Sequence, residues 1–351
     1  MILMNTPPLR IGILGCANIA KQFARDVAPS PTVDIVAVAS RNADTAAAFA
    51  SAQGIARSHG SYEALLSDPG VDAIYLPLPN SMHAEWAIKA AAAGKHVLSE
   101  KPLALNQAEA RAMFDAAKAN GVMLLESYPW YFQPQTGQLV DLLRDGAIGS
   151  VRSIQASFGF TLPSPQTNIR MKPELGGGAL LDAGSYPLSL IRLVMGCAPE
   201  RVLADVSWAA SGVDMSATAT LSYADGRRAQ LSCAMDVCIH RFATIIGTNG
   251  VITTEFLNHT SPDAGTHPHG YLPSQMRARR GTIATPFEEV RAESGSGFRF
   301  AAEAFAKVIA DKDFAAIDRA AAASIDIAAT LEALARSAVE GRAVNLAHLP
   351  H

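Results

Sequence analysis

The sequence lacks the features that mark membrane proteins and nucleic-acid-binding proteins. Its 351 residues contain no apolar run of the about 20 residues that span a bilayer. They contain no basic run either, and the formal net charge is only −3, so no nucleic acid is expected as a partner. Residues 1–10 have no apolar core of signal-peptide length. These absences predict a soluble, cytoplasmic protein with no membrane contact.

Cysteine is scarce as well. The four cysteines stand at positions 16, 197, 233 and 238, and no two form a Cys-x-x-Cys pair. Scattered cysteines of this kind predict reduced packing thiols and disfavour a zinc or dithiol motif. His267 and His269 flank a proline in a glycine-rich loop, but no carboxylate stands at ligand spacing. We therefore expect no metal site.

The first part of the chain alternates short apolar runs with helical patterns. Strands are expected at 9–15, 33–39, 73–77, 96–99 and 122–126, and helices after residue 17 and at 44–53, 62–67, 83–93 and 107–120. This alternation is typical of a parallel, doubly wound sheet. Such sheets bind ligands beyond the carboxyl ends of their strands.

The turn after the first strand follows a dinucleotide-binding pattern. Gly15-Cys-Ala17-Asn18-Ile19-Ala20 matches Gly-x-Gly-x-x-Gly/Ala, with alanine at the middle position. In this pattern the first glycine makes the tight turn, and the middle residue lets the backbone approach a pyrophosphate at the helix N-terminus. Ala17 adds only a methyl group, so the loop remains possible.

The second strand lacks the acidic residue that holds the ribose hydroxyls of NAD. Asp34 lies at the wrong end of this strand, and Ser40 and Arg41 follow its correct end. A guanidinium binds phosphate with its planar fork, so this pair favours NADP(H). The alternative is a solvated arginine at a strand end.

Further polar residues follow the next two strands. Leu78, Asn80 and His83 come after the strand at 73–77, and Glu100 and Lys101 come after the strand at 96–99. Because the carboxyl ends of parallel strands lie at one edge of a sheet, we expect these five residues to line the cofactor site.

The stretch Gly176-Gly-Gly-Ala-Leu-Leu-Asp182-Ala-Gly-Ser-Tyr186-Pro combines a glycine run with two proton-handling side chains. The glycines indicate that the backbone passes close to another group before a helix begins. Asp182 and Tyr186 are four residues apart, so they share one face of that helix. A carboxylate and a phenol can move a proton if that face looks into a cleft. The alternative is a surface helix whose tyrosine packs and whose aspartate faces water.

From residue 151 the pattern becomes strand-rich. Strands are expected at 151–160, 201–209, 215–223, 228–235, 242–247 and 251–256, with hairpin turns at Asp225-Gly226 and Asn249-Gly250 and a helical tail at 298–338. Alternating polar and apolar residues indicate an antiparallel sheet with one wet or partner-covered face. Apolar residues on both parities of strands 201–235 predict a homodimer through this open face.

These patterns predict an α/β protein with two domains. Residues 1–126 are expected to form a Rossmann doubly wound parallel sheet, and residues 127–351 an α+β domain with a large, mainly antiparallel open sheet. An aromatic cluster at 128–132 is either core packing or the wall of a pocket for a small ring. The residues expected to contact substrate are Tyr128, Trp130, Phe160 and Arg170.

Five motifs in order resemble the glucose–fructose oxidoreductase/inositol dehydrogenase family, often called Gfo/Idh/MocA. They are Gly15-Cys-Ala-Asn-Ile-Ala, Ser40-Arg41, Pro77-Leu-Pro-Asn-Ser-Met-His83, Glu100-Lys101-Pro102 and the stretch from Gly176 to Pro187. The chain is most similar to the branch of NADP-linked xylose dehydrogenases, dihydrodiol dehydrogenases and aldose oxidoreductases. The resemblance covers nearly the whole chain, and it implies an enzyme that acts on a sugar or a cyclic polyol.

The resemblance also implies that Lys101 and Tyr186 face the nicotinamide, with Asp182 nearby. A free tyrosine titrates near pH 10, roughly three units too high for a base at neutrality. A nearby ammonium stabilises the phenolate. Tyr186 is therefore expected to act as acid/base, Lys101 as its electrostatic partner and Asp182 as the group that orients it, while the cofactor supplies the hydride.

Two positions depart from the pattern of this branch. Thr45 stands where a further basic residue is common, and Tyr131-Phe-Gln133-Pro replaces the usual Arg-Phe-His-Pro. Two alternatives to a dehydrogenase remain open: an aldose–aldose oxidoreductase that keeps NADP(H) bound, and a non-catalytic regulator that senses a dinucleotide or a sugar. The presence of Lys101 and Tyr186 argues against the regulator.

Overall fold

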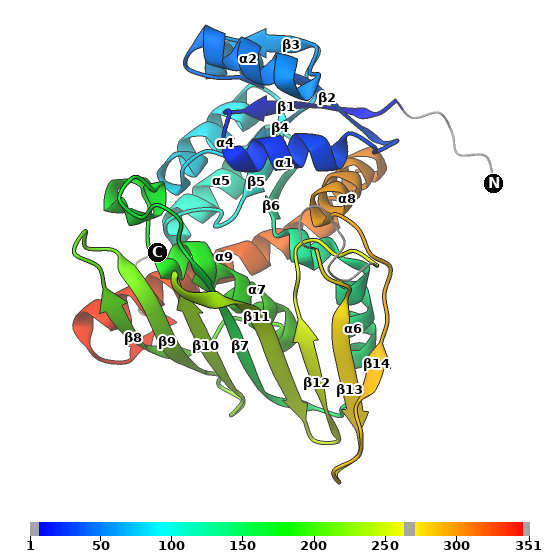
Figure 1. Ribbon diagram of the computed structural model, residues 1–351, viewed down its shortest axis with the longest axis vertical. Coiled ribbons are helices and arrows are strands. Elements are labelled where there is room, and N and C mark those ends of the chain that lie inside the picture. Colours follow the sequence, from blue (N-terminus) through cyan, green and yellow to red (C-terminus); the bar gives the residue numbers. More distant parts are fainter. Residues whose placement is uncertain (1–6, 263–270, 347–351) are drawn as a thin grey trace, which may run out of the picture. The chain divides into compact units, whose positions relative to one another are not determined.

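The computed structural model describes residues 7–262 and 271–346 (Figure 1). His267 and His269 lie outside these ranges. The chain divides into two compact units, one made of residues 1–104, 109–129 and 296–322, the other of residues 105–108, 130–295 and 323–351. The boundary expected after residue 126 lies near the crossing at 129. The sequence patterns did not predict that residues 296–322 return to the first unit.

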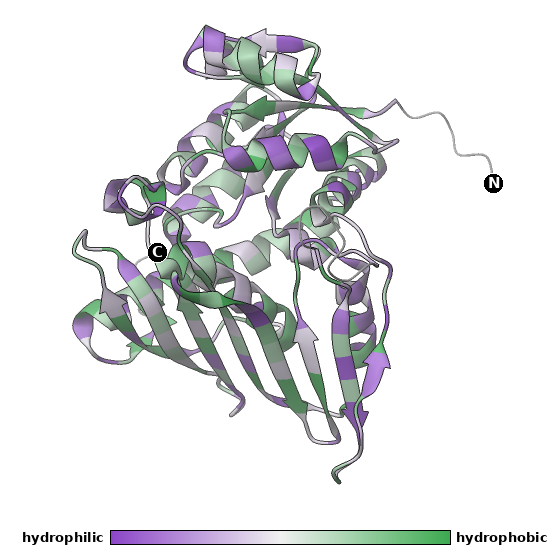
Figure 2. Ribbon diagram, viewed as in Figure 1, coloured by the Kyte–Doolittle hydropathy of each residue, from purple (hydrophilic) through white to green (hydrophobic). Residues whose placement is uncertain are grey.

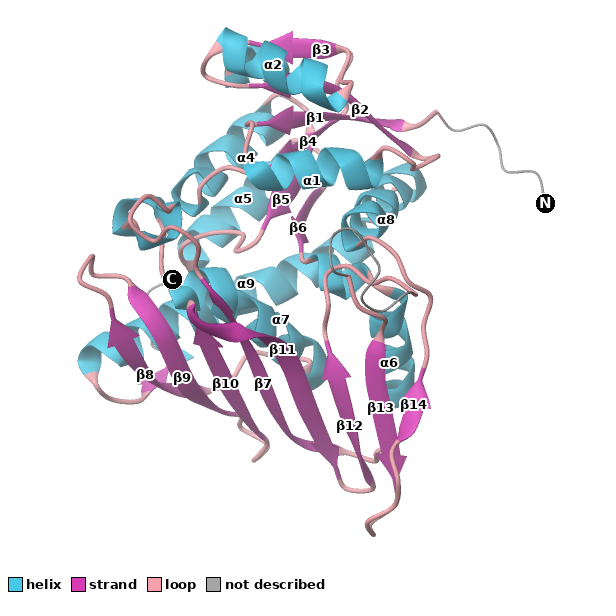
Figure 3. Ribbon diagram, viewed as in Figure 1, coloured by secondary structure: helices cyan, strands magenta, loops and turns pink. Residues whose placement is uncertain are grey.

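The first unit contains a six-stranded parallel sheet. Its strands run in the order β3 (Arg57–His59), β2 (Val33–Ala39), β1 (Leu9–Leu14), β4 (Ala73–Leu76), β5 (His96–Glu100) and β6 (Leu124–Ser127) (Figure 3). The strand order reverses direction between β1 and β4, which is the switch point where open α/β sheets bind their ligands. The predicted doubly wound sheet is confirmed, and β3 is a strand that the sequence patterns missed.

Helices alternate with these strands. They are α1 (Asn18–Val27), α2 (Ala43–Gln53), α3 (Tyr62–Leu66), α4 (His83–Ala92) and α5 (Gln107–Ala119), and α8 (Gly297–Asp311) joins this unit from the C-terminal part of the chain. α1 buries Ala20, Phe23, Ala24 and Val27, which lie on one side of a helix because of their spacing.

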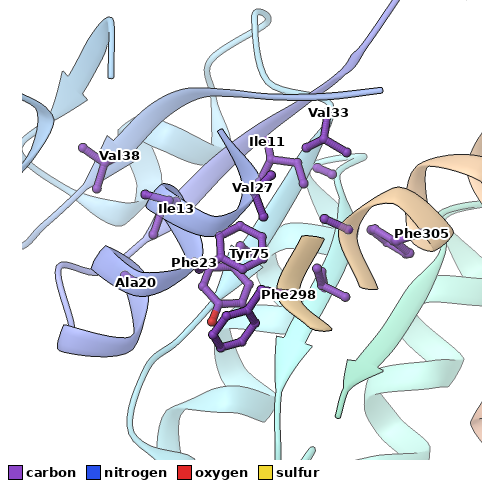
Figure 4. Packing of buried hydrophobic residues seen from close by; sticks show 14 of the residues in the cluster. Ile11, Ile13, Ala20, Phe23, Val27, Val33, Val38, Tyr75, Phe298 and Phe305 are labelled. Atoms are coloured by element: carbon purple, nitrogen blue, oxygen red, sulfur yellow. The ribbon is translucent and has the colours of Figure 1, made fainter. Parts of the chain in front are cut away.

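Aromatic side chains explain why α8 belongs to the first unit. The ring of Phe23 stacks on Tyr75 of β4 with 3.7 Å between centroids. Phe298 of α8 meets Phe23 edge to face at 5.7 Å (Figure 4). Phe298 and Phe305 are both buried in this core, so α8 covers apolar surface that α1 alone would leave exposed.

The second unit contains a nine-stranded, mainly antiparallel sheet. Its strands run in the order β14 (Glu288–Val290), β13 (Gln275–Arg280), β12 (Gly250–Glu255), β11 (Asp236–Gly247), β7 (Val151–Thr161), β10 (Arg228–Ala234), β9 (Asp214–Ser222), β8 (Arg201–Trp208) and β15 (Val344–Asn345). Among the strands within the described ranges, β10 and β7 form the one parallel pair of this sheet. Both predicted hairpins are present, between β9 and β10 and between β11 and β12.

The expected boundaries differ most at β11. The prediction placed its start at Phe242, whereas the strand begins at Asp236. Its pairing with β7 shifts between Asp236 and His240, and a bulge of this kind breaks the two-residue alternation from which strands are recognised. The strands β13, β14 and β15 were also not expected.

The two faces of this sheet differ in polarity. Leu203, Thr220, Gln230, Gln155 and Thr244 align across five strands on the outer face. The adjacent row on the inner face reads Ala204, Ala219, Leu231, Ala156 and Ala243, and it is buried. Colours alternate accordingly along the strands in Figure 2. The expectation of apolar residues on both parities of strands 201–235 was therefore wrong, because hydroxyl and amide side chains occupy the outer parity.

Helices pack on the inner face of the sheet. They are α6 (Pro134–Arg144), α7 (Ser185–Met195) and the later part of α9 (Phe314–Glu340). Gln135 of α6 donates hydrogen bonds to Thr254 and to the carbonyl oxygen of Glu255, and Ser337 of α9 accepts one from the backbone of Ala204. Among the described residues, no helix has both the length and the apolar character needed to cross a membrane.

Candidate active site

The glycine turn after β1 has the geometry that a dinucleotide requires. Gly15 has φ +120°, a conformation that side chains disfavour, and a Cβ there would lie 2.9 Å from Leu78. Its N–H donates to the carbonyl oxygen of Ala39 at 2.9 Å, which fixes the turn to the end of β2. Leu78 thus covers this turn.

The N-terminus of α1 follows this turn and is open. Ala17 is the N-cap residue in extended conformation, and its side chain makes no cap hydrogen bond. Asn18 and Ile19 are exposed, Ile19 by 37 %. The first N–H groups of a helix lack intrahelical partners and attract anions, so this end fits a pyrophosphate.

Ser40 and Arg41 lie at the carboxyl end of β2. Asp34 pairs in register with Arg10 at the opposite end, as the sequence indicated. The Ser40 hydroxyl accepts from the backbone N–H of Asn42 at 3.3 Å, and the Arg41 side chain is exposed. This edge therefore presents a hydroxyl and a cation, and no carboxylate of β2 stands there.

Tyr62 is a neighbour of Arg41 that sequence reasoning missed. Burial raises the pKa of the Tyr62 hydroxyl, while the charge of Arg41 and a side-chain hydrogen bond with it oppose that rise. Tyr62 and Arg41 are thus electrostatic neighbours at the end of β2. Only the fold brings α3 to this position, because no local pattern links residues 41 and 62.

His83 lies between two loops at the edge of the parallel sheet. It is fully buried, its Nδ1 lies 2.9 Å from the carbonyl oxygen of Pro102, and its Nε2 lies 2.8 Å from that of Leu78. Burial lowers the pKa of the imidazole. Both ring nitrogens thus lie within hydrogen-bond distance of backbone carbonyl oxygens, and the ring bridges the loop after β4 and the turn after β5. The expected contact of His83 with the cofactor stays a prediction.

Glu100 is the last residue of β5 and Lys101 follows it, and their side chains differ in exposure. Glu100 is buried, and its carboxylate accepts from the Tyr75 hydroxyl at 2.6 Å, so it faces the interior of the first unit. The expected contact of Glu100 with the cofactor stays a prediction. Lys101 is partly exposed, and Asn80 begins a short 3-10 turn over Asn80–Met82 at the same edge of the sheet.

In the second unit, the glycine run passes close to backbone and to a buried carboxylate. A Cβ on Gly177 would collide with the carbonyl oxygen of Arg170, and one on Gly178 would collide with the Asp214 carboxylate. Asp214 also accepts from the N–H of Leu180 at 2.6 Å, and burial raises its pKa. The sequence-based inference of a close approach is therefore confirmed.

Replacing Gly178 with alanine is expected to lower the free energy of unfolding by about 1–3 kcal/mol. The new methyl group would displace the Asp214 carboxylate, and the backbone has φ +112°. Urea denaturation measures the change. Gly212→Ala is the matched control, since Gly212 also has positive φ but no atom within 4 Å of an added Cβ. Equal losses in the two variants would contradict this account.

Helical backbone carries Asp182 and Tyr186. A π-helical turn over Leu180–Gly184 leads directly into α7, which contains Tyr186. The Asp182 carboxylate accepts from the Arg170 guanidinium at 2.6 Å, and this attraction raises the pKa of Arg170 against the effect of its burial. Arg170, expected to contact substrate, is thus placed beside Asp182.

Two residues that sequence reasoning missed surround the Tyr186 ring. Asn258 Nδ2 lies 3.1 Å from the Tyr186 hydroxyl. The guanidinium carbon of Arg241 lies 4.4 Å from the centroid of the Tyr186 ring and 4.1 Å from that of Phe158. Tyr186 is 7 % exposed, so its hydroxyl lies in a largely dry, cationic environment.

Gln133 explains one departure from the sequence pattern. It is buried, and its amide nitrogen donates to the carbonyl oxygens of Asn258 at 2.7 Å and Gly295 at 2.9 Å. Its own oxygen accepts from the Thr260 hydroxyl. Gln133 therefore holds the segment that carries Asn258.

The remaining residues expected to contact substrate divide between core and partly exposed positions. Trp130 is 1 % exposed and donates to the Ser189 hydroxyl, and Tyr128 is 5 % exposed, so both pack as core. Phe160 is partly exposed, with its ring 5.6 Å from that of Phe158. Within residues 7–262 and 271–346, no three His, Cys, Asp or Glu side chains gather as a metal site would require.

Comparisons with known proteins agree with this architecture. Residues 9–128 match the model of the GFO_IDH_MocA oxidoreductase family, NAD-binding Rossmann fold, and residues 136–253 match the GFO/IDH/MocA C-terminal domain. A D-xylose 1-dehydrogenase (NADP(+)) of Haloferax volcanii is 32 % identical over 339 residues, which cover 96 % of this chain and 100 % of the relative.

Two solved structures are similar over nearly the whole chain. A 3-ketoreductase from Actinomadura kijaniata in complex with NADP and TDP-benzene has a TM-score of 0.81 and 31 % identity, covering 94 % of this chain and 98 % of its own. An aldose-aldose oxidoreductase from Caulobacter crescentus has a TM-score of 0.83 and 27 % identity, covering 96 % and 99 %. With its Rossmann unit, its open sheet and both family models matched, the chain belongs to the Gfo/Idh/MocA family of oxidoreductases.

Proposed function

We propose that this protein is an NADP-dependent oxidoreductase that transfers a hydride between the nicotinamide and a sugar, its lactone or a related cyclic polyol. The observation that carries the proposal is the Tyr186 hydroxyl, which lies within hydrogen-bond distance of Asn258 and beside the Arg241 guanidinium. Such surroundings suit a phenol that alternately holds and releases a proton. The relatives support the chemistry, since they include a xylose dehydrogenase, a ketoreductase and an aldose-aldose oxidoreductase.

The first unit supplies the residues that would hold the cofactor. Gly15 and the open N-terminus of α1 at Ala17 fit a pyrophosphate, and Ser40 and Arg41 fit a 2′-phosphate. NADP in the complex of the ketoreductase supports this choice of cofactor. The bound cofactor would supply or accept the hydride.

Tyr186 would move the proton, and Lys101 and Asp182 would assist it. In the oxidative direction Tyr186 takes the proton of the substrate hydroxyl, and in the reductive direction its hydroxyl donates a proton to the carbonyl oxygen. We propose that the Lys101 ammonium favours the phenolate form. Asp182, paired with Arg170, would orient the reacting groups.

One alternative concerns how the cofactor cycles. An enzyme that retains NADP(H) would oxidise one sugar and reduce the next, and the similarity to an aldose-aldose oxidoreductase favours this possibility. Gel filtration distinguishes the two modes. Cofactor that stays with the protein through the column supports hydride exchange between two sugars, whereas loss of the cofactor supports a dehydrogenase.

A screen for NADP(H)-linked turnover over pentoses, hexoses, their lactones and cyclic diols tests the proposed function. We expect at least one of these classes to turn over, with NADPH formed or consumed. Intact NADPH binding without turnover of any class would contradict the enzyme and favour a regulator that senses a dinucleotide.

We also propose a cytoplasmic location for the protein. The four cysteines of the chain are free thiols, which is consistent with this location.

We further propose a homodimer through the outer face of the nine-stranded sheet. Leu203 and Phe242 are 48 % and 53 % exposed on this face, among hydroxyl and amide side chains. We expect light scattering at micromolar concentration to give the mass of a dimer and Leu203→Asp to shift it to that of a monomer. A monomeric wild-type protein would rule out this arrangement.

A further inference from the structure

A guanidinium lies against the aromatic ring of the proposed acid/base. Arg241 of β11 stands opposite Phe158 of β7, so both project from the inner face of the sheet. Its guanidinium carbon lies 4.1 Å from the Phe158 centroid, 4.4 Å from the Tyr186 centroid and 5.8 Å from the Phe256 centroid. Cations are attracted to ring faces within about 6 Å. Three aromatic rings therefore fix the position of this charge beside Tyr186.

The electrostatics of Arg241 connect it to the Tyr186 hydroxyl. Burial lowers the pKa of the guanidinium, whereas attraction to Tyr186 and Asp182 and a side-chain hydrogen bond with Tyr186 oppose this effect. An arginine side chain remains charged in proteins. Arg241 is partly buried, and a cation that is partly removed from water interacts with the phenol oxygen more strongly than it would at the surface.

The orientation of the Asn258 amide follows from its contact with Arg241. Arg241 Nη1 lies 2.7 Å from Asn258 Oδ1, and a guanidinium can only donate hydrogen bonds. The atom facing Arg241 must therefore be the amide oxygen, which directs the amide nitrogen toward Tyr186 at 3.1 Å. Asn258 consequently donates a hydrogen bond to the phenol oxygen, and that oxygen accepts.

We propose that Arg241 and Asn258 hold the Tyr186 oxygen as a hydrogen-bond acceptor and stabilise negative charge on it, so that both are positioning residues for proton transfer. The inference rests on the proposed function. Because the Tyr186 oxygen accepts from Asn258, this contact does not use the proton of the hydroxyl group. When that proton leaves, the oxygen keeps an N–H donor and a neighbouring cation.

Other ionisable groups near Tyr186 do not cancel this effect. Arg170 is a second cation, and its interaction with Tyr186 raises the pKa of its guanidinium. Asp182 is the nearby carboxylate, but it is paired with Arg170 at 2.6 Å. Cys233 lies beside the π-helical turn, and burial raises the pKa of its thiol strongly, which keeps it neutral. Arg241 therefore remains as a cation whose charge is available to the phenol.

Titration of the Tyr186 phenol in the full-length protein tests the proposal without any substrate. The ultraviolet absorbance of tyrosinate is followed against pH, and the curve of the Tyr186→Phe variant is subtracted. We expect Arg241→Met to raise the pH midpoint of Tyr186 ionisation by about one to three units, the shift that a single opposite charge at this distance produces. Asn258→Ala is expected to raise it by about one unit or less, because only a neutral donor is lost.

Two further variants make the result specific. Arg277→Met is the matched control, since Arg277 on β13 also lies over a phenylalanine ring, Phe287 at 5.6 Å. It should leave the midpoint unchanged. If Arg241→Met fails to fold, Arg241→Lys and Asn258→Ala carry the test, and near-ultraviolet circular dichroism establishes that they fold.

The outcomes separate this inference from the proposed function. A midpoint that rises in Arg241→Met and Asn258→Ala, together with a parallel shift in the pH profile of kcat, supports the positioning role. Unchanged midpoints in folded Arg241 and Asn258 variants would overturn it, even if the wild type turns over sugars. A wild type without turnover but with the expected shifts would overturn the proposed function, while the effect on the phenol would remain.

Discussion

Replacement of Tyr186 by phenylalanine is expected to lower kcat by about 10²–10⁴-fold, the usual contribution of general acid–base catalysis. The variant keeps the aromatic ring that packs at 5.2 Å from Phe158 and under the Arg241 guanidinium, and it loses only the hydroxyl. Binding of NADPH, whose proposed contacts lie in the first unit, should stay nearly intact. Steady-state kinetics and fluorescence titration of NADPH measure the two effects.

Tyr223→Phe is the matched control for this result. Tyr223 is a buried tyrosine of the same unit whose pKa is raised by burial, and nothing places it in the proposed chemistry. Its substitution should leave kcat within a few-fold of the wild type. If Tyr186→Phe also kept kcat within a few-fold of the wild type, the assignment of Tyr186 as the acid/base would be contradicted.

A combined Ser40→Asp and Arg41→Ala variant is expected to reverse the preference for the cofactor. Loss of the guanidinium removes a charge-assisted hydrogen bond of roughly 1.5–3 kcal/mol, which is about ten- to a hundred-fold in affinity for NADPH. The new carboxylate would repel the 2′-phosphate and accept from the ribose hydroxyls of NADH. Because Thr45 adds no cation there, the wild type should retain some use of NAD.

Dissociation constants of NADPH and NADH, measured by quenching of protein fluorescence, test this prediction. Arg41→Ala alone should weaken NADPH and leave NADH almost unchanged. Arg25→Ala is a suitable control, since Arg25 is an exposed residue of α1 paired with Asp26. If Arg41→Ala weakened both nucleotides equally, Arg41 would be structural and the choice of cofactor would be wrong.

Much of the first unit could be predicted because its signals are local. The strands β1, β2 and β4 are short apolar runs buried on both faces, and helices separate them. Such segments are recognised from the sequence alone. For the same reason Gly15, Ser40 and Lys101 could be assigned to strand ends without the structure.

The environment of Tyr186 could not be predicted in this way. Arg241 and Asn258 come from residues far along the chain, and their contacts depend on the register of β11 with β7. A shifted register hid the start of β11, so Arg241 was left outside any expected strand. Likewise, only the packing of α4 shows that both nitrogens of His83 lie close to backbone carbonyl oxygens. Residues whose role depends on long-range pairing carry no local pattern.

Transfer of deuterium tests the central claim most directly. The purified protein is incubated with NADP⁺ and aldoses or cyclic diols that carry deuterium at the carbon to be oxidised, and the mass of the nucleotide is measured. Hydride transfer with Tyr186 as base predicts NADPH that carries one deuterium, formed by the wild type and strongly reduced in Tyr186→Phe. Recovery of only unlabelled NADP⁺ from every substrate, although the nucleotide binds, would contradict an oxidoreductase of this class.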